Sequence, residues 1–122
     1  MPQITTPSLI IDELKGIYVC EFTSSRILDE TNIKEIGDAL SKLVDGRESP
    51  RILLDFLNVD HLSSAALGML INVNNRVKQR KGQLRLCKIR PQILEVFAIT
   101  KLNRLFKILP TREEAMQSFT TH

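Results

Sequence analysis

The sequence is poor in cysteine and contains no uninterrupted apolar run long enough to cross a bilayer. It also begins without the charged segment and following apolar segment of a secretory signal. Cys20 and Cys87 each lie in an apolar, strand-like context and form no Cys-x-x-Cys spacing, so we expect two buried thiols rather than a disulfide. These absences predict a cytoplasmic protein of a reducing compartment with no membrane attachment.

The sequence also lacks the motifs of the common catalytic sites. It has no Gly-x-Ser-x-Gly elbow, no Walker A loop and no cluster of metal ligands, and its second histidine is the terminal His122. Asp60, His61, Ser63 and Ser64 include the residue types of a hydrolytic triad, but residues this close on one segment cannot readily form the serine–imidazole–carboxylate line. We therefore expect no enzyme, no metal and no cofactor, and we interpret His61 as a solvent-facing loop residue.

Excess charge is small, with a formal net charge of +3, which argues against a dedicated nucleic-acid binder. One segment carries seven basic residues and no acidic one, namely Arg76, Lys78, Arg80, Lys81, Arg85, Lys88 and Arg90. This segment is the strongest local argument for a nucleic-acid surface. However, no aromatic residue interleaves it for base stacking, and basic residues also suit a helix C-terminus. We therefore predict no nucleic-acid partner.

What the sequence does contain is a central stretch from Arg51 to Gly68. Its apolar run from Ile52 to Leu54 predicts a buried central strand, and a polar turn follows. Ser63 and Ser64 are good helix N-caps, and they precede a helix predicted from about Ser64 to Lys81, with Gly82 as its C-terminal cap. Because a helix start points free backbone N–H groups outward and attracts anionic groups, we expect a recognition point at this turn.

The rest of the chain alternates strands with helices. Strands are predicted over Ser8 to Leu14, Ile17 to Phe22, Leu84 to Cys87 and Leu105 to Ile108, and a short helix from Pro91 and a closing helix over Thr111 to Phe119. A longer helix is predicted from the spacing of Ile27, Leu28, Ile33, Ile36, Leu40, Leu43 and Val44, with Asp29 or Thr31 as cap and Gly46 at its end.

This order predicts an α/β fold in one domain over residues 1–122, with residues 1–7 as a loose leader. We expect a mixed, mainly parallel sheet of about five strands with about four helices. Helices between strands imply parallel crossovers, so the N-terminal strand is expected to be an antiparallel edge.

The order of elements and the central stretch together resemble the STAS domain family, especially the bacterial anti-sigma factor antagonists. The resemblance runs from about Ser8 to Phe119 and is most specific at Leu54-Asp55, Val59, Leu62 and Ser63 to Gly68. Two later segments, Lys81 to Cys87 and Ile99 to Phe106, are also similar to the family's fourth strand and its approach to the last one.

The resemblance implies a partner-switching module that binds an anti-sigma factor, which is also a serine kinase of the histidine-kinase-like ATPase type. In such systems phosphorylation of the antagonist ends the interaction and a phosphatase restores it. The family usually reads Asp-Ser-Ser-Gly-Leu-Gly, with the second serine as acceptor, whereas this chain has Ala65 at that position and serines at Ser63 and Ser64. Three interpretations follow: constitutive binding, a switch moved to Ser64 or Ser63, or a scaffold or accessory subunit of a larger signalling or transport assembly.

The resemblance and the predicted geometry together place a partner-binding face at the turn, the helix start and the outward positions of the helix. Its expected members are Asn58, Asp60, His61, Ser63, Ser64, Ala65, Gly68, Met69, Asn72 and Asn75. Gly68 would allow close approach of a partner backbone, and Met69 either faces outward or packs in the core. Ser24, Ser25 and Arg26 also follow a strand, so we expect them at the same sheet end.

Overall fold

The computed structural model describes residues 4–6 and 8–119. Within these ranges the strands are β1 (Ile4–Thr6), β2 (Leu9–Leu14), β3 (Ile17–Phe22), β4 (Arg26–Ile27), β5 (Arg51–Asp55), β6 (His61–Leu62), β7 (Gln83–Cys87) and β8 (Lys107–Leu109). The α-helices are α1 (Glu30–Asp45), α2 (Ser64–Gln79), α3 (Pro91–Ile99) and α4 (Arg112–Gln117), and a short 3₁₀ helix, η1, spans Leu102–Arg104.

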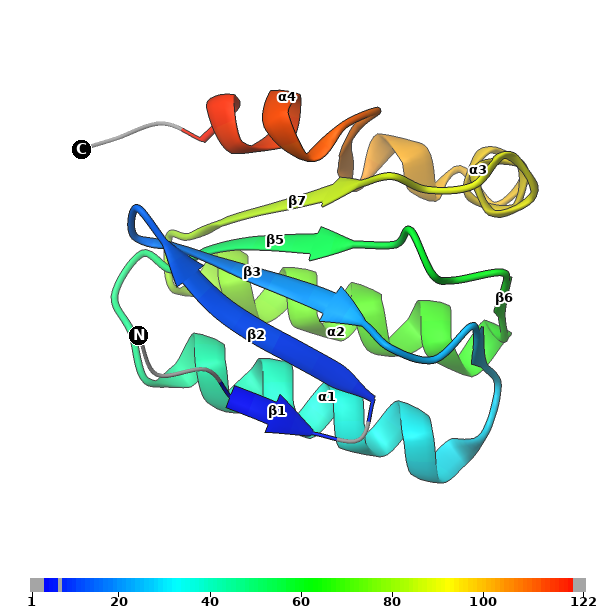
Figure 1. Cartoon of the computed structure of the whole chain (residues 1–122), viewed down its shortest axis with the longest axis horizontal. Coiled ribbons are helices and arrows are strands. Elements are labelled where there is room, and N and C mark those ends of the chain that lie inside the picture. Colours follow the sequence, from blue (N-terminus) through cyan, green and yellow to red (C-terminus); the bar gives the residue numbers. More distant parts are fainter. Residues whose placement is uncertain (1–3, 7, 120–122) are drawn as a thin grey trace.

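The main sheet confirms the predicted α/β fold class. Its strand order is β1-β2-β3-β5-β7-β8 over the described part of the chain, with β1–β2 and β2–β3 antiparallel and β3–β5, β5–β7 and β7–β8 parallel. The strands β3, β5 and β7 run in the same direction, so their carboxyl ends meet at one end of the sheet (Figure 1). The loops that follow these strands are therefore gathered at that end.

Two apolar layers hold the sheet between helices. The helices α1 and α2 cover one face, and α4 covers part of the other (Figure 1). Leu54 and Leu86 point into the larger layer with Leu40 and Leu70 from the helices, and all four are at most 1% exposed. The smaller layer on the α4 side contains Ile17, Val19, Leu53, Cys87 and Ala115. The alternation of apolar side chains along β3 and β7 follows from this two-sided burial.

Both cysteines are buried free thiols, as predicted. Burial raises the pKa of Cys20, and burial together with the charge of Asp55 raises the pKa of Cys87 to about 12. Both shifts favour the neutral thiol, as expected for cysteines packed in the core.

The prediction of a loose leader over residues 1–7 is wrong for Ile4–Thr6. These residues form β1 and pair antiparallel with β2, with Ile4 opposite Ile11 and Thr6 opposite Leu9. The β-branched residues of this segment favour an extended edge strand, and this preference outweighs the two flanking prolines. The edge strand raises the main sheet to six strands, and the remaining residues of the predicted leader, 1–3 and 7, lie outside the described residues.

The helical interpretation of Ile27 and Leu28 is also wrong. Ile27 belongs to β4, whose register pairs it with Leu62, and Asp29 starts α1 by accepting a hydrogen bond from the Thr31 N–H at 3.1 Å. Ile27 is 1% exposed and is buried as part of a strand. An apolar residue buried from a strand is easily counted with the apolar residues of a following helix, which explains the wrong prediction.

Gly82 does not have the predicted capping conformation. The left-handed residue after α2 is Lys81, with φ of 58°, and the C-cap is Arg80. Gly82 is instead required by close packing, because a Cβ there would lie 2.3 Å from the carbonyl oxygen of Pro50.

Candidate functional site

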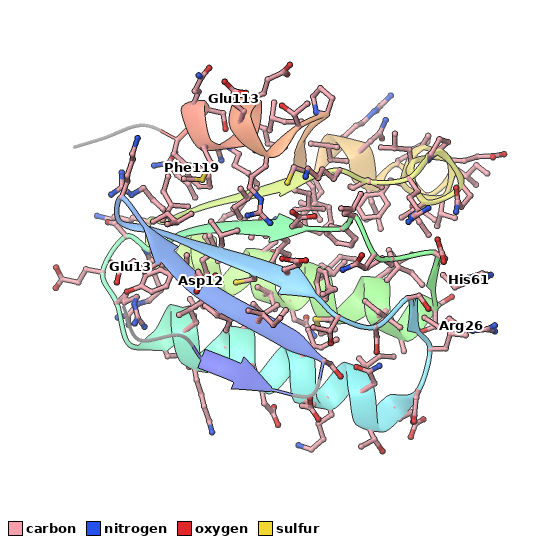
Figure 2. All side chains as sticks on the ribbon, in the orientation of Figure 1. Asp12, Glu13, Arg26, His61, Glu113 and Phe119 are labelled. Atoms are coloured by element: carbon pink, nitrogen blue, oxygen red, sulfur yellow. The ribbon has the colours of Figure 1, made fainter. Side chains whose placement is uncertain are left out.

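The candidate site lies where the chain leaves β3 and β5. The short strands β4 and β6 pair in parallel, with Arg26 opposite His61, and the carbonyl oxygen of Ser25 accepts hydrogen bonds from the N–H groups of Asp60 (2.7 Å) and His61 (3.1 Å). Figure 2 shows Arg26 and His61 side by side at one end of the molecule, with Glu13 at the opposite end. The structure thus brings the loop after β3 together with the turn after β5. We call this end of the sheet, with the start of α2, the tip.

The two serines at the start of α2 have different environments. Ser63 is half-buried, and its Oγ accepts a hydrogen bond from the Ala66 N–H at 3.1 Å, so Ser63 is the N-cap. Ser64 is exposed, and its hydroxyl forms no hydrogen bond with the residues that the structure describes. Ala65 beside it is also exposed. A modifying enzyme would therefore meet the Ser64 hydroxyl first, whereas reacting Ser63 would remove a cap worth about 1 kcal/mol.

Asn58 and Asp60 are held by contacts within the chain. The Asn58 side-chain N–H₂ donates to the Phe22 carbonyl oxygen at 3.1 Å and lies 3.5 Å from a carboxylate oxygen of Glu21. Asp60 forms an ion pair with Arg90 at 3.1 Å. Both side chains of this pair are about two-fifths exposed, so we expect less than about 1 kcal/mol from it. These two predicted binding residues therefore shape the loop as well as bordering it.

Ser24 is also engaged, because its Oγ accepts a hydrogen bond from the Asn32 side chain of α1 at 3.2 Å. Ser25 and Arg26 are exposed at the same end, as is His61, so the exposed part of the tip near β4 and β6 carries these three residues. Within residues 4–6 and 8–119, no group of three His, Cys, Asp or Glu side chains is placed to hold a metal ion.

Met69, Asn72 and Asn75 lie away from the tip, along a groove between α1 and α2. The groove has a volume of about 660 Å³ and is lined by Ile33, Lys34, Gly37, Asp38, Ser41, Met69, Asn72, Val73, Asn75, Arg76 and Gln79. With a rise of 1.5 Å per residue, Asn75 is roughly 16 Å along the axis from Ser64. Met69 is half-buried against Gly37. It therefore lies between the two predicted positions, one facing outward and one packed in the core.

Gly68 stands one turn into α2 with open space beside it. A Cβ at this position would meet nothing within 4 Å, in contrast to Gly82. A glycine inside a helix costs about 0.5–1 kcal/mol relative to alanine. No contact inside the described chain requires a glycine at this position.

Asp55 at the end of β5 anchors α4 to the sheet. Its carboxylate is 1% exposed and accepts hydrogen bonds from the Arg112 guanidinium at 3.1 and 2.6 Å. Burial lowers the pKa of Arg112, but the hydrogen bond and charge of Asp55, with the charge of Glu21, outweigh burial and raise it. The second Asp55 oxygen accepts from the Leu57 N–H at 2.9 Å, so this buried carboxylate also fixes the start of the loop at the tip.

Two exposed leucines at the tip, Leu57 and Leu28, were not predicted from the sequence. The side chain of Leu57 is 47% exposed and that of Leu28 is 41% exposed, and both lie in loops at the tip. The available signal was their position, because each is an apolar residue placed directly beside polar loop residues after a strand.

Four arginines of the basic segment have partners inside the chain. Arg76 pairs with Asp45 at 2.8 Å, Arg80 donates to the Arg47 carbonyl oxygen, Arg85 donates to Ser118, and Arg90 donates to the Leu57 carbonyl oxygen. The segment therefore supports the ends of helices and strands.

Among the described residues, no helix is both long enough and apolar enough to span a bilayer.

Comparison with known proteins places this geometry in a family. Residues 8–115 match the STAS domain. BtrV of Bordetella bronchiseptica, a protein assigned as an anti-sigma factor antagonist, is 29% identical over 113 residues, which cover 93% of this chain and 95% of BtrV.

Solved structures share the fold. A STAS domain anti-sigma-factor antagonist protein from Planctomyces limnophilus superposes with a TM-score of 0.80 at 21% identity, covering 90% of this chain and 96% of that chain. The phosphorylated form of the Bacillus cell fate determinant SpoIIAA superposes with a TM-score of 0.69 at 17% identity, covering 90% and 97%. At these identities the structures establish the fold, and the match over residues 8–115 establishes that the chain belongs to the STAS domain family.

Proposed function

We propose that this chain is an anti-sigma factor antagonist, a binding protein without catalytic activity that captures a serine-kinase anti-sigma factor in the cytoplasm. The observation that carries the proposal is the tip, where exposed residues of three segments meet around an accessible helix start. The relationship to BtrV over nearly the whole chain supports the same role. The proposed contact residues are Ser25, Arg26, His61, Ser64, Ala65 and Gly68, with Ser24, Asn58, Asp60 and Ser63 shaping the surface from within.

Gly68 and Ala65 favour a partner that docks directly on the first turns of α2. Both residues are small, and the space beside Gly68 is open. A partner helix or strand can therefore approach the α2 backbone closely without moving a side chain. We propose that Met69, Asn72 and Asn75 extend this contact along the groove between α1 and α2.

We further propose that the kinase phosphorylates Ser64 rather than Ser63. Ser64 is exposed and its hydroxyl is uncommitted within the described chain, whereas the Ser63 hydroxyl caps α2. A phosphate in the first turn is favoured locally by the helix dipole and by free backbone N–H groups. The same added charge lies inside the proposed contact surface, so it opposes docking until a phosphatase removes it.

Purification of the tagged wild-type chain from its source cell tests the binding role. We expect a histidine-kinase-like ATPase to copurify, and the purified ATPase should bind the purified chain directly in calorimetry. Recovery of membrane or scaffold proteins in its place, with no direct binding of an ATPase, would overturn the antagonist proposal.

Incubation of the chain with that purified ATPase and ATP tests the switch. We expect one phosphate on the wild type and on Ser63→Ala, and none on Ser64→Ala, by intact mass and peptide mapping. A phosphate retained on Ser64→Ala, or no mass gain on the wild type, would overturn the assignment of the switch to Ser64 and would favour Ser63 or constitutive binding respectively.

A further inference from the structure

Leu57 is an exposed apolar side chain on a loop that is fixed on both sides. The neighbouring Phe56 and Val59 are fully buried, and the Phe56 N–H donates to the Cys87 carbonyl oxygen at 3.0 Å. The loop between β5 and β6 is therefore anchored in the core immediately before Leu57 and two residues after it.

Side chains from other elements hold both backbone groups of Leu57. Its N–H donates to the buried carboxylate of Asp55 at 2.9 Å, and its carbonyl oxygen accepts from Arg90 Nε at 2.9 Å. Arg90 also pairs with Asp60 at 3.1 Å, so one guanidinium joins two residues of the loop. Arg112 in turn holds Asp55. The loop is thus braced from the start of α3 and from α4.

This bracing matters because it presents Leu57 in one position. The Leu57 side chain is nearly half exposed, so a large part of its apolar surface stays in water, while hydrogen bonds from Asp55 and Arg90 fix the backbone that carries it. A preorganised loop loses less conformational entropy on binding than a mobile one, so the same contact yields more affinity. An apolar side chain fixed at the tip is the type of residue that fills a pocket on a partner.

We infer that Leu57 is an apolar anchor of the partner-binding surface and that Arg90 is its positioning residue. The occupant is the kinase-type anti-sigma factor, so this inference rests on the proposed function. Leu57 lies in the same loop as Asn58 and Asp60, which makes it continuous with the surface proposed above. The partner is expected to offer an apolar pocket that excludes water around the Leu57 side chain.

The first test compares two leucines of similar exposure by calorimetry with the purified ATPase that copurifies with the wild type. Leu57→Ser should weaken binding about tenfold. Leu14→Ser is the matched control, because Leu14 is 44% exposed but lies at the turn between β2 and β3, at the other end of the sheet. Its affinity should stay within about twofold of wild type. Both variants should lower the unfolding temperature by a similar small amount, since the two side chains are exposed to a similar degree.

The second test separates positioning from charge. Arg90→Gln should weaken binding about threefold and should increase the amide exchange of Leu57 and Val59, whose N–H groups are hydrogen-bonded within the loop. Arg104→Gln, which removes an exposed charge without a partner among the described residues, should change neither. If Arg90 acts through Leu57, Arg90→Gln combined with Leu57→Ser should bind no more weakly than Leu57→Ser alone.

The outcomes separate this inference from the proposed function. Wild-type binding with no loss in Leu57→Ser overturns the anchor role and leaves the proposed function standing. Additive losses, or a loop whose wild-type amides already exchange as fast as those of an open chain, overturn the positioning role of Arg90. Absence of wild-type binding to the ATPase overturns the proposed function, and the anchor role falls with it.

Discussion

The two ends of the sheet are built differently, although the same strands reach both. At the end opposite the tip, polar groups are used inside the chain: Arg47 donates to the Leu43 carbonyl oxygen and stacks over Tyr18, and Arg80 donates to the Arg47 carbonyl oxygen. At the tip, backbone groups are also hydrogen-bonded, but the Ser64 hydroxyl and the Leu57 side chain are exposed to solvent. Both ends expose an apolar side chain, Leu57 at the tip and Leu14 opposite, but the tip adds the uncommitted Ser64 hydroxyl at a helix start, which is why we propose the tip as the partner-binding surface.

The largest expected effect comes from Gly82, the glycine at the end opposite the tip. Gly82→Ala would place a Cβ 2.3 Å from the Pro50 carbonyl oxygen, so the junction of α2 with β7 must shift. We expect the free energy of unfolding to fall by about 2–3 kcal/mol, measured by urea denaturation. An unchanged midpoint would show that this end is looser than the close packing indicates.

The second effect separates the two serines of the tip. Ser63→Ala removes the hydrogen bond from the Ala66 N–H and should lower the free energy of unfolding by about 1 kcal/mol. Ser64→Ala removes an uncommitted hydroxyl and should change stability by less than about 0.5 kcal/mol. Equal destabilisation by the two changes would mean that the hydroxyls share the capping role.

The glycine of the tip should respond in the opposite direction to Gly82. Gly68→Ala adds a methyl group into open space and raises helix propensity, so stability should increase by about 0.5–1 kcal/mol. The same change should weaken binding of the purified ATPase, because the methyl group occupies the approach to α2. A gain in stability with full binding would remove Gly68 from the contact surface.

The smallest effect is expected from the ion pair between Arg76 and Asp45, whose side chains are about half exposed. Arg76→Gln should lower the free energy of unfolding by less than about 0.5 kcal/mol, and the difference should shrink further in high salt. A larger loss would show that this pair contributes more to the packing of α1 against α2 than its exposure predicts.

Much of the fold could be predicted from the sequence because its local signals agree with the final structure. The capping residues Asp29, Ser63 and Thr111 each accept the expected hydrogen bond from the first turn of a helix. The apolar run from Ile52 to Leu54 is fully buried as predicted. The predictions failed where tertiary pairing adds to a local preference, as in Ile4–Thr6, whose β-branched residues favour a strand that pairing with β2 completes.

The site was predictable in outline and not in its internal contacts. Chain order indicated that the loops after β3 and β5 would meet, because carboxyl ends of parallel strands lie at one edge. Sequence spacing gave no sign that Arg90, 33 residues away, would hold the Leu57 carbonyl oxygen, or that Arg112 would hold Asp55. Such contacts depend on side chains from distant elements, so the sequence predicts Asn58 and Asp60 at the surface but does not indicate the braced, exposed Leu57.

The most direct test of the account places one negative charge at each end of the sheet. Ser64→Asp adds it at the tip, and Ser49→Asp adds it at an exposed loop residue before β5, where φ is 49° and aspartate is tolerated. Binding of the purified ATPase should weaken at least about thirtyfold in Ser64→Asp and stay within about twofold in Ser49→Asp. Equal affinities for the two variants would contradict the claim that the tip is the partner-binding surface.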